Sequence, residues 1–259
     1  MKIIPWTPFE NIIAGTTLRQ GGVSTGSLSS LNLALNVNDD IEHVIKNREI
    51  FANYFNTDFN HIISPTQTHS TNFKKASIED GGKGMYDFCE ELNQTDALYT
   101  RDENLFLLTY HADCTPILIY DCKEHLIASI HAGWKGNVNG IVLKTVRHLI
   151  ENEHCLPENM YAYIGPCLGY EAFEAKDDII DLVKQMEINT TPYYKEVSSG
   201  VYRLDAKGLT KEQLTYLGIP ASHITIDPNC TKSDPENFFS FRYDRACGRH
   251  VSFICMKNS

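Results

Sequence analysis

The chain has 259 residues, which at roughly 100–200 residues per domain makes one large domain or two small ones. Hydrophobic residues make up 42% and charged residues 22%, an ordinary globular composition that excludes collagen, coiled coil and general disorder. The 23 basic and 33 acidic residues give a net charge of −10, so a broad nucleic-acid interface is not expected. A small anionic ligand would need a local cluster of donors.

Neither the cysteines nor the apolar runs indicate export or membrane insertion. The eight cysteines are scattered without a Cys-x-x-Cys pair, so we expect free thiols in a reducing cytoplasm. The first residues lack the apolar core of a signal peptide, and no apolar run approaches the roughly 18 residues of a membrane span. No linker or repeat divides the sequence, which predicts one domain over residues 1–259, as a monomer or weak oligomer.

In chain order, the apolar pattern predicts strands and helices in alternation. A first strand covers residues 12–18, and an amphipathic helix follows the capping pair Asp39 and Asp40. A polar stretch over residues 79–95 indicates a long surface loop. Nearly continuous apolar runs then predict strands that are covered on both faces, at residues 106–110, 116–120 and 126–130.

The second half continues the alternation. Helices are predicted over residues 138–150 and 179–186 and after the capping residue Asp205, with strands at residues 160–164 and 224–226. Strands and helices mixed throughout the chain indicate a layered α/β or α+β domain.

Three segments place imidazole or thiol side chains near predicted strands, at His69, Cys114 and His131. Two histidines and one cysteine form a known catalytic zinc set, whose open fourth position admits water or a substrate oxygen. Their spacing matches no metal motif, so two other interpretations stay open. One is buried structural side chains, and the other is a nucleophilic pair with Cys114 as thiolate and His131 as base.

A fourth candidate, His111, lies three residues before Cys114, so on an extended strand the two side chains leave opposite faces. We therefore expect His111 to contact the substrate or a metal ligand rather than the metal. Multicopper oxidase chemistry needs many more imidazoles than a His–Cys–His set, commonly in His-x-His pairs. The chain contains no such pair, so a full multicopper set is not expected.

Two glycine-containing turns are candidates for holding an anion. Arg19 precedes Gly21 and Gly22, where exposed backbone N–H groups and a planar guanidinium suit phosphate. Lys135 lies just before the helix predicted from residue 138, where free N–H groups and the helix dipole favour negative charge. A plain turn with a solvated cation remains the alternative for each.

Two later turns supply further candidates. Glu171 follows the strand at residues 160–164, and Arg242 ends an aromatic segment at residues 238–242. Each segment alone is more typical of packing. We place Glu171 before Asp113 as a proton carrier, because Asp113 should point away from Cys114 on an extended strand.

Taken together and in this order along the chain, these segments resemble those of the YfiH/YlmD-type family. The resemblance covers nearly the whole chain, from residue 17 to about residue 249, and its joint order is specific although each piece is weak. The matching stretches are residues 17–24, Gln67-Thr68-His69, Asp96-Ala97-Leu98, residues 112–116, residues 131–136, residues 164–167 with Tyr170-Glu171, Leu204-Asp205, Cys230-Thr231 and residues 238–242.

That family carries two names, polyphenol oxidase (laccase domain) and purine nucleoside phosphorylase. The resemblance implies one α/β domain with central β-sheets sandwiched by helices, similar to the catalytic domain of the cytotoxic necrotizing factor deamidases. It implies a zinc site, with copper as the alternative metal, at His69, Cys114 and His131. It also implies phosphate-dependent cleavage of adenosine, guanosine or inosine, with side activities in adenosine deamination and methylthioadenosine cleavage.

For such a reaction we expect substrate contacts from Arg19, Lys135, Glu171 and Arg242. His111 departs from the small residue common in the family, and Lys135 replaces a common arginine, keeping the charge but losing bidentate geometry. The competing functions are a copper polyphenol oxidase, a Cys–His amidohydrolase, and a binding protein without turnover.

Overall fold

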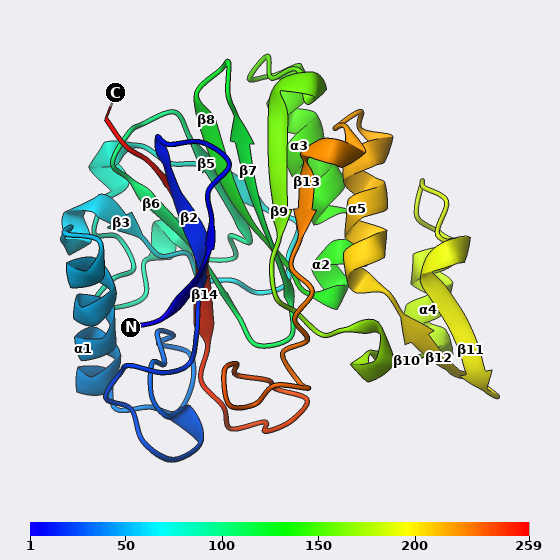
Figure 1. Cartoon of the computed structure of the whole chain (residues 1–259), viewed down its shortest axis with the longest axis horizontal. Coiled ribbons are helices and arrows are strands. Elements are labelled where there is room, and N and C mark those ends of the chain that lie inside the picture. Colours follow the sequence, from blue (N-terminus) through cyan, green and yellow to red (C-terminus); the bar gives the residue numbers. More distant parts are fainter. Residues whose placement is uncertain (259) are drawn as a thin grey trace.

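Two β-sheets pack face to face at the centre of the fold in the computed structural model, which describes residues 1–258 (Figure 1). One sheet has the order β1-β2-β14-β6-β3 and the other the order β13-β9-β7-β8-β5-β4. The first comprises β1 (Ile3–Trp6), β2 (Ile12–Thr17), β3 (Ile62–Ile63), β6 (Phe106–His111) and β14 (His250–Met256). The second comprises β4 (Phe73–Lys75), β5 (Ala97–Thr100), β7 (Thr115–Asp121), β8 (Leu126–Ala132), β9 (Met160–Ile164) and β13 (Ile224–Ile226).

Helices cover the two outer faces of this pair of sheets (Figure 1). On one side, α1 (Ile41–Tyr54) packs the ring of Phe51 against Phe106 and Phe253 of the first sheet. On the other side, α3 (Ile141–Glu151) and α5 (Ala206–Tyr216) pack on the second sheet, and α2 (Trp134–Val138) precedes α3. A smaller sheet of order β10-β12-β11 lies beside α4 (Asp177–Lys184). Its strands are β10 (Glu174–Lys176), β11 (Tyr194–Ser198) and β12 (Val201–Leu204).

The space between the two large sheets is filled by apolar side chains from both. Leu107 and Ile254 meet Leu118 and Ile127 in one buried cluster. Strands β7 and β8 are buried along their whole length, since one face meets the other sheet and the opposite face meets α3 and α5. This confirms the α/β sandwich and explains the continuous apolar runs of these strands.

Most predicted elements are present, and the carboxylates of Asp40 and Asp205 cap α1 and α5 as expected. One helix boundary was wrong. The helix predicted from residue 138 is two helices, because Gly140 adopts a left-handed conformation (φ 86°) between α2 and α3. Lys135 therefore lies inside the short helix α2 rather than in a turn before a long one. The sequence pattern did not predict eight of the strands, which are β1, β3, β4, β5, β10, β11, β12 and β14.

Three further expectations are settled by the described residues. The stretch 79–95 carries only short 3-10 turns, as expected of a surface loop. The eight cysteines are all free thiols. Within residues 1–258, no helix has the length and apolar character needed to cross a membrane.

Candidate functional site

Strand register brings Cys114 and His131 to one face of the second sheet. Pro116 of β7 lies opposite His131 of β8 in the antiparallel pair, and Cys114 is two residues before Pro116. Residues two apart on an extended chain share a face, so Cys114 comes diagonally next to His131. The predicted strand pair therefore builds two of the three candidate ligand positions.

His69 reaches the same place from the loop between β3 and β4. Its backbone is left-handed (φ 61°), and the carboxylate of Asp96 holds this turn. Asp96 accepts the backbone N–H of His69 at 3.0 Å and that of Ser70 at 2.7 Å. The same carboxylate lies 2.8 Å from Nδ1 of His131. One buried carboxylate thus orients both histidines, and the sequence analysis did not assign it this role.

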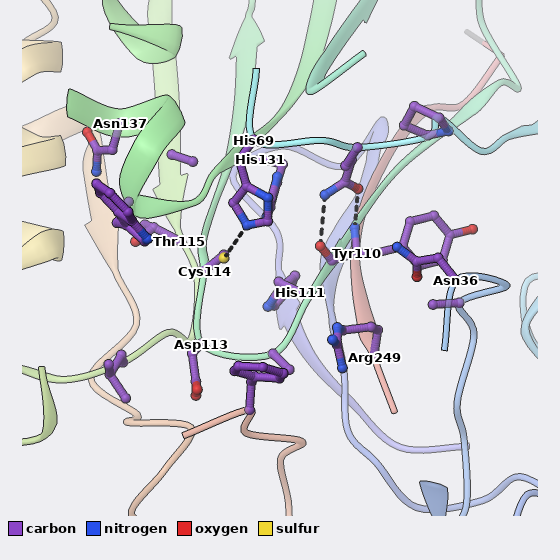
Figure 2. A pocket seen from close by; sticks show the side chains of 18 of the residues that line it. Asn36, His69, Tyr110, His111, Asp113, Cys114, Thr115, His131, Asn137 and Arg249 are labelled. Carbon is purple, nitrogen blue, oxygen red and sulfur yellow. Dashed lines mark hydrogen bonds between the residues drawn. The ribbon is translucent and has the colours of Figure 1, made fainter. Parts of the chain in front are cut away.

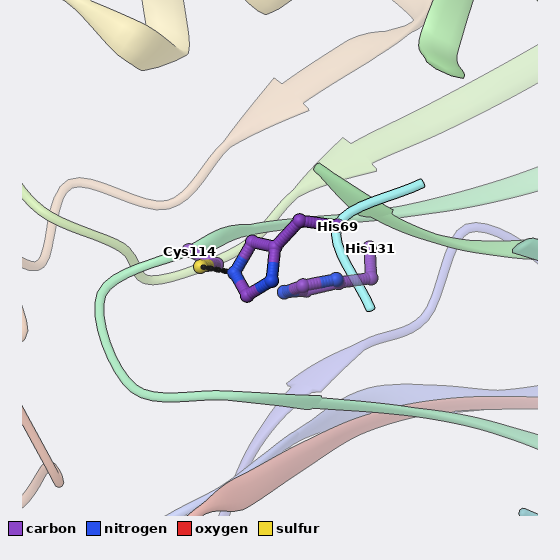
Figure 3. Close-up of side chains that lie close together, drawn as sticks. All are labelled: His69, Cys114 and His131. Atoms are coloured by element: carbon purple, nitrogen blue, oxygen red, sulfur yellow. Dashed lines mark hydrogen bonds between the residues drawn. The ribbon is translucent and has the colours of Figure 1, made fainter. Parts of the chain in front are cut away.

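The three side chains point toward one another (Figure 3). Their ligand atoms all lie within 4.8 Å of one another, and Sγ of Cys114 is 3.5 Å from Nε2 of His69. Tetrahedral zinc bonds of about 2.0–2.3 Å place such atoms about 3.3–3.6 Å apart. His131 directs Nδ1 at Asp96, which leaves Nε2 for a metal, the arrangement that carboxylate–histidine–zinc sites use. The donor set therefore suits a zinc ion, and the distance between Cys114 and His69 matches the tetrahedral spacing.

The charges in this group favour a thiolate. Burial opposes ionisation, but the neighbouring imidazoles of His131 and His69 lower the pKa of the Cys114 thiol to about 6. Burial likewise opposes protonation of His131, but the Cys114 thiolate and the Asp96 carboxylate raise its pKa to about 9. Without metal the pair is a thiolate beside an imidazolium, and a metal cation displaces the imidazolium proton when it binds.

Gly133 leaves space for two of the three candidate ligands, His69 and Cys114. A Cβ atom there would lie 2.1 Å from Cδ2 of His69 and 3.1 Å from Sγ of Cys114. No side chain fits at that distance, so a glycine is required beside the site.

A cavity of about 380 Å³ opens next to His69, Cys114 and His131, where the two large sheets end (Figure 2). Its size lies within the roughly 300–1,000 Å³ typical of small-molecule pockets. Two exposed aromatic rings, Phe88 and Phe241, belong to its lining. Flat aromatic faces at a cavity mouth suit a flat heterocycle such as a purine.

Of the four predicted substrate contacts, Arg242 lines the cavity and the other three lie outside its lining. Arg19 donates to the backbone carbonyls of Ser29 and Pro235, and the N–H groups of Gly21 and Gly22 donate to Ser30. Nε and Nη1 of Arg19 and the two glycine N–H groups, which were expected to bind phosphate, therefore already have protein partners.

The other two predicted contacts are exposed side chains. Lys135 projects from α2, with Nζ 5.6 Å from the ring of Trp134. Glu171 is exposed in a 3-10 turn at Tyr170–Ala172. The structure instead adds Arg249 to the cavity lining, directly before β14. The available signal was an arginine that precedes an apolar run, but that run was not predicted to be a strand.

His111 and Asp113 also line the cavity, and neither belongs to the group of possible metal ligands. Nε2 of His111 lies 2.9 Å from Oγ of Ser252, and its ring meets that of His250 at 4.3 Å. The carboxylate of Asp113 accepts the hydroxyl of Thr231 and the backbone N–H of Arg242, both at 2.6 Å. His111 thus lines the cavity and contacts Ser252 and His250, while Asp113 ties neighbouring loops together.

Comparison with known proteins assigns the chain to one family. The family model for multi-copper polyphenol oxidoreductase laccases matches residues 13–257. Purine nucleoside phosphorylase YlmD of Bacillus subtilis is 36% identical over 251 residues, which are 96% of this chain and 90% of the relative.

Solved structures agree with this assignment. The crystal structure of the hypothetical protein YfiH of Bacillus licheniformis has a TM-score of 0.96 and 34% identity, covering 98% of this chain and 96% of its own. That of YlmD from Geobacillus stearothermophilus has a TM-score of 0.95 and 32% identity, covering 100% of this chain and 98% of its own. The chain therefore belongs to the laccase-like YfiH/YlmD family, in which the curated relatives are named purine nucleoside phosphorylases.

Proposed function

We propose that this protein is a zinc-dependent purine nucleoside phosphorylase. It cleaves adenosine, guanosine or inosine with phosphate to the free base and ribose 1-phosphate. The observation that carries the proposal is the His–Cys–His group on the wall of a nucleoside-sized cavity, in a chain whose relatives bear this name. Adenosine deamination and methylthioadenosine cleavage are proposed as side activities. We further propose that residues 1–259 act as one domain, as a monomer or weak oligomer, in the cytoplasm, where free thiols stay reduced.

His69, Cys114 and His131 would hold the metal, with Asp96 fixing the tautomer of His131. Zinc bound there supplies a Lewis acid that polarises a substrate oxygen. The buried Asp96 carboxylate accepts the Nδ1 proton of His131, so Nε2 is the nitrogen that would bind a metal once it has lost its own proton.

The other residues that line the cavity bind the substrates and exclude water from them. Cleavage of the bond between the purine and C1′ passes through an oxocarbenium-like state, so the cavity must hold phosphate near C1′ and keep the base in place. The faces of Phe88 and Phe241 offer stacking surfaces for the base. Arg242 offers positive charge to phosphate. Arg19, Lys135 and Glu171 remain predicted contacts that lie outside the lining.

Two alternative functions are each supported by one specific observation. The family description and the His–Cys–His set favour a copper phenol oxidase. Against it, a blue-copper site takes a methionine as its usual axial ligand, and no methionine lines the cavity among residues 1–258. The contacts among Cys114, His131 and Asp96 favour a metal-free Cys–His amidohydrolase.

The experiment that separates these functions compares the zinc-loaded wild type with C114A and H131A. Both variants should lose bound zinc and phosphorolysis of inosine together. C89S is the matched control, since Cys89 lies outside the cavity lining, and it should keep both. A metal-free wild type that hydrolyses an amide or amidine substrate without phosphate, and that iodoacetamide inactivates, supports the amidohydrolase. Oxygen consumption with phenols after copper loading supports the oxidase.

A further inference from the structure

The arginines of this chain differ in how their charge is balanced; among residues 1–258, Arg19 and Arg245 lie outside the cavity lining and form no ion pair. Outside the cavity, Arg101, Arg147 and Arg203 pair with carboxylates. Among residues 1–258, the three arginines that line the cavity form no ion pair; they are Arg48, Arg242 and Arg249. The chain carries ten more acidic than basic residues, so unpaired arginines gathered at one cavity are a local excess of positive charge.

Arg48 uses its donors inside the protein. It donates to the carbonyls of Leu33, Gly84 and Met85, and to the hydroxyls of Ser64 and Tyr110. A guanidinium has five N–H groups, so this set saturates it. Arg48 therefore stabilises the wall of the cavity and has no donor left for a ligand.

Arg249 is held in a different way. Its Nη1 donates to the carbonyls of Cys247 and Gly248 at 2.7 and 3.0 Å, and its guanidinium carbon lies 5.7 Å from the centre of the Phe241 ring. Nε and Nη2 make no hydrogen bond to the described residues. These two nitrogens form the side-on fork that matches two oxygens of a phosphate or carboxylate. Arg249 is thus fixed on one side and open on the other, the state of a preorganised anion ligand.

The groups around Arg249 do not neutralise it. Figure 2 shows its guanidinium directed toward the side of the cavity where His111 and Asp113 lie. Burial and the Arg249 charge lower the pKa of His250 to about 3, and burial also lowers that of His111, so both imidazoles are neutral. Asp113 is the one carboxylate in the lining among residues 1–258, and Thr231 and the backbone of Arg242 occupy it.

We propose that Arg249 is the principal ligand of an anionic co-substrate, inorganic phosphate, and that Arg242 is the second cation of this subsite. Arg242 uses Nη2 on the carbonyl of Glu174 and lies over Phe173, which leaves its other donors available. The identity of the anion rests on the proposed function; the subsite itself rests on the two open guanidiniums. It replaces Arg19 and Lys135 as the phosphate donors of the cavity.

The test is direct binding of inorganic phosphate to the zinc-loaded full chain, measured by isothermal titration. R249M should raise the phosphate Kd by at least about tenfold, because two charge-assisted hydrogen bonds are lost. R249K keeps the charge without the fork and should lie between R249M and the wild type. R147M removes the same charge from an exposed pair with Glu187 and should bind phosphate like the wild type.

Turnover separates this proposal from the proposed function. With inosine as substrate, R249M should raise the KM for phosphate and leave the KM for inosine unchanged. Phosphorolysis with an unchanged phosphate KM in R249M would overturn the subsite while supporting the function. If the wild type binds phosphate but cleaves no nucleoside, and R249M does not bind phosphate, the result would support the subsite while refuting the function.

No phosphate binding by the wild type at millimolar concentration, or equal Kd values for R249M and R147M, would overturn the subsite. If R249M does not fold, R249K decides by the same comparison.

Discussion

Replacing Asp96 with asparagine should weaken the metal site without removing a metal ligand. The carboxylate accepts hydrogen bonds from Nδ1 of His131, from the backbone of His69 and from both the backbone and hydroxyl of Ser70. Asparagine keeps the shape but turns one acceptor oxygen into an NH₂ group that faces these donors. Loss of such a carboxylate partner costs roughly 10–100-fold in metal affinity, which corresponds to about 1.4–2.7 kcal/mol.

The measurement is zinc affinity by competition with a chromophoric chelator at pH 7. D121N is the matched control, because Asp121 is also buried and accepts two backbone N–H groups, in the turn at the opposite end of β7. D121N should lower the free energy of unfolding and leave the zinc Kd unchanged. A D96N variant that binds zinc as tightly as the wild type would refute the orienting role of Asp96.

Three further predictions concern the ligand group and the cavity wall. G133A should lose most bound zinc, measured by atomic emission, because the added methyl overlaps His69; full zinc content would contradict the packing argument. In metal-free protein, the rate of Cys114 alkylation by iodoacetamide should rise with pH and level off above a pKa of about 6, since the thiolate is the reactive form. Zinc should suppress this reaction, and a rate that still climbs between pH 8 and 9 would show an ordinary thiol. R48M should lower the free energy of unfolding in urea by about 3 kcal/mol or more, because buried carbonyls lose their donor; a wild-type midpoint would show that they find other partners.

The long central strands, and Cys114 and His131 at their ends, were predictable because their signals are local, whereas the grouping of these two residues with His69 as a zinc site came from the family resemblance. The apolar runs of β7 and β8 are continuous, and Cys114 and His131 stand at the ends of those runs. The layered α/β class followed from the alternation of strands and helices. The sandwich of two sheets between helices came from the family resemblance, because strand order depends on pairings such as β14 with β2 that join distant parts of the chain.

The substrate contacts were harder to predict for a related reason. Arg19 looked free in its glycine turn, but it donates to the carbonyl of Pro235, which is 216 residues away. Asp96 orients His69 and His131 through hydrogen bonds to residues 26 to 35 positions away in the sequence. Lys135 was predicted to lie just before a long helix, but Gly140 divides this region into two helices and Lys135 lies in the first of them. In each case a long-range contact or one left-handed residue determined which donors face the cavity.

The central claim is phosphate-dependent cleavage at the His–Cys–His site, and one product analysis tests it most directly. Zinc-loaded protein is incubated with inosine, with and without phosphate, and hypoxanthine and ribose 1-phosphate are quantified against C114A. We expect equal amounts of the two products with phosphate and neither product in the C114A reaction. Free ribose in place of ribose 1-phosphate, or unchanged inosine with fully zinc-loaded wild type, would contradict it.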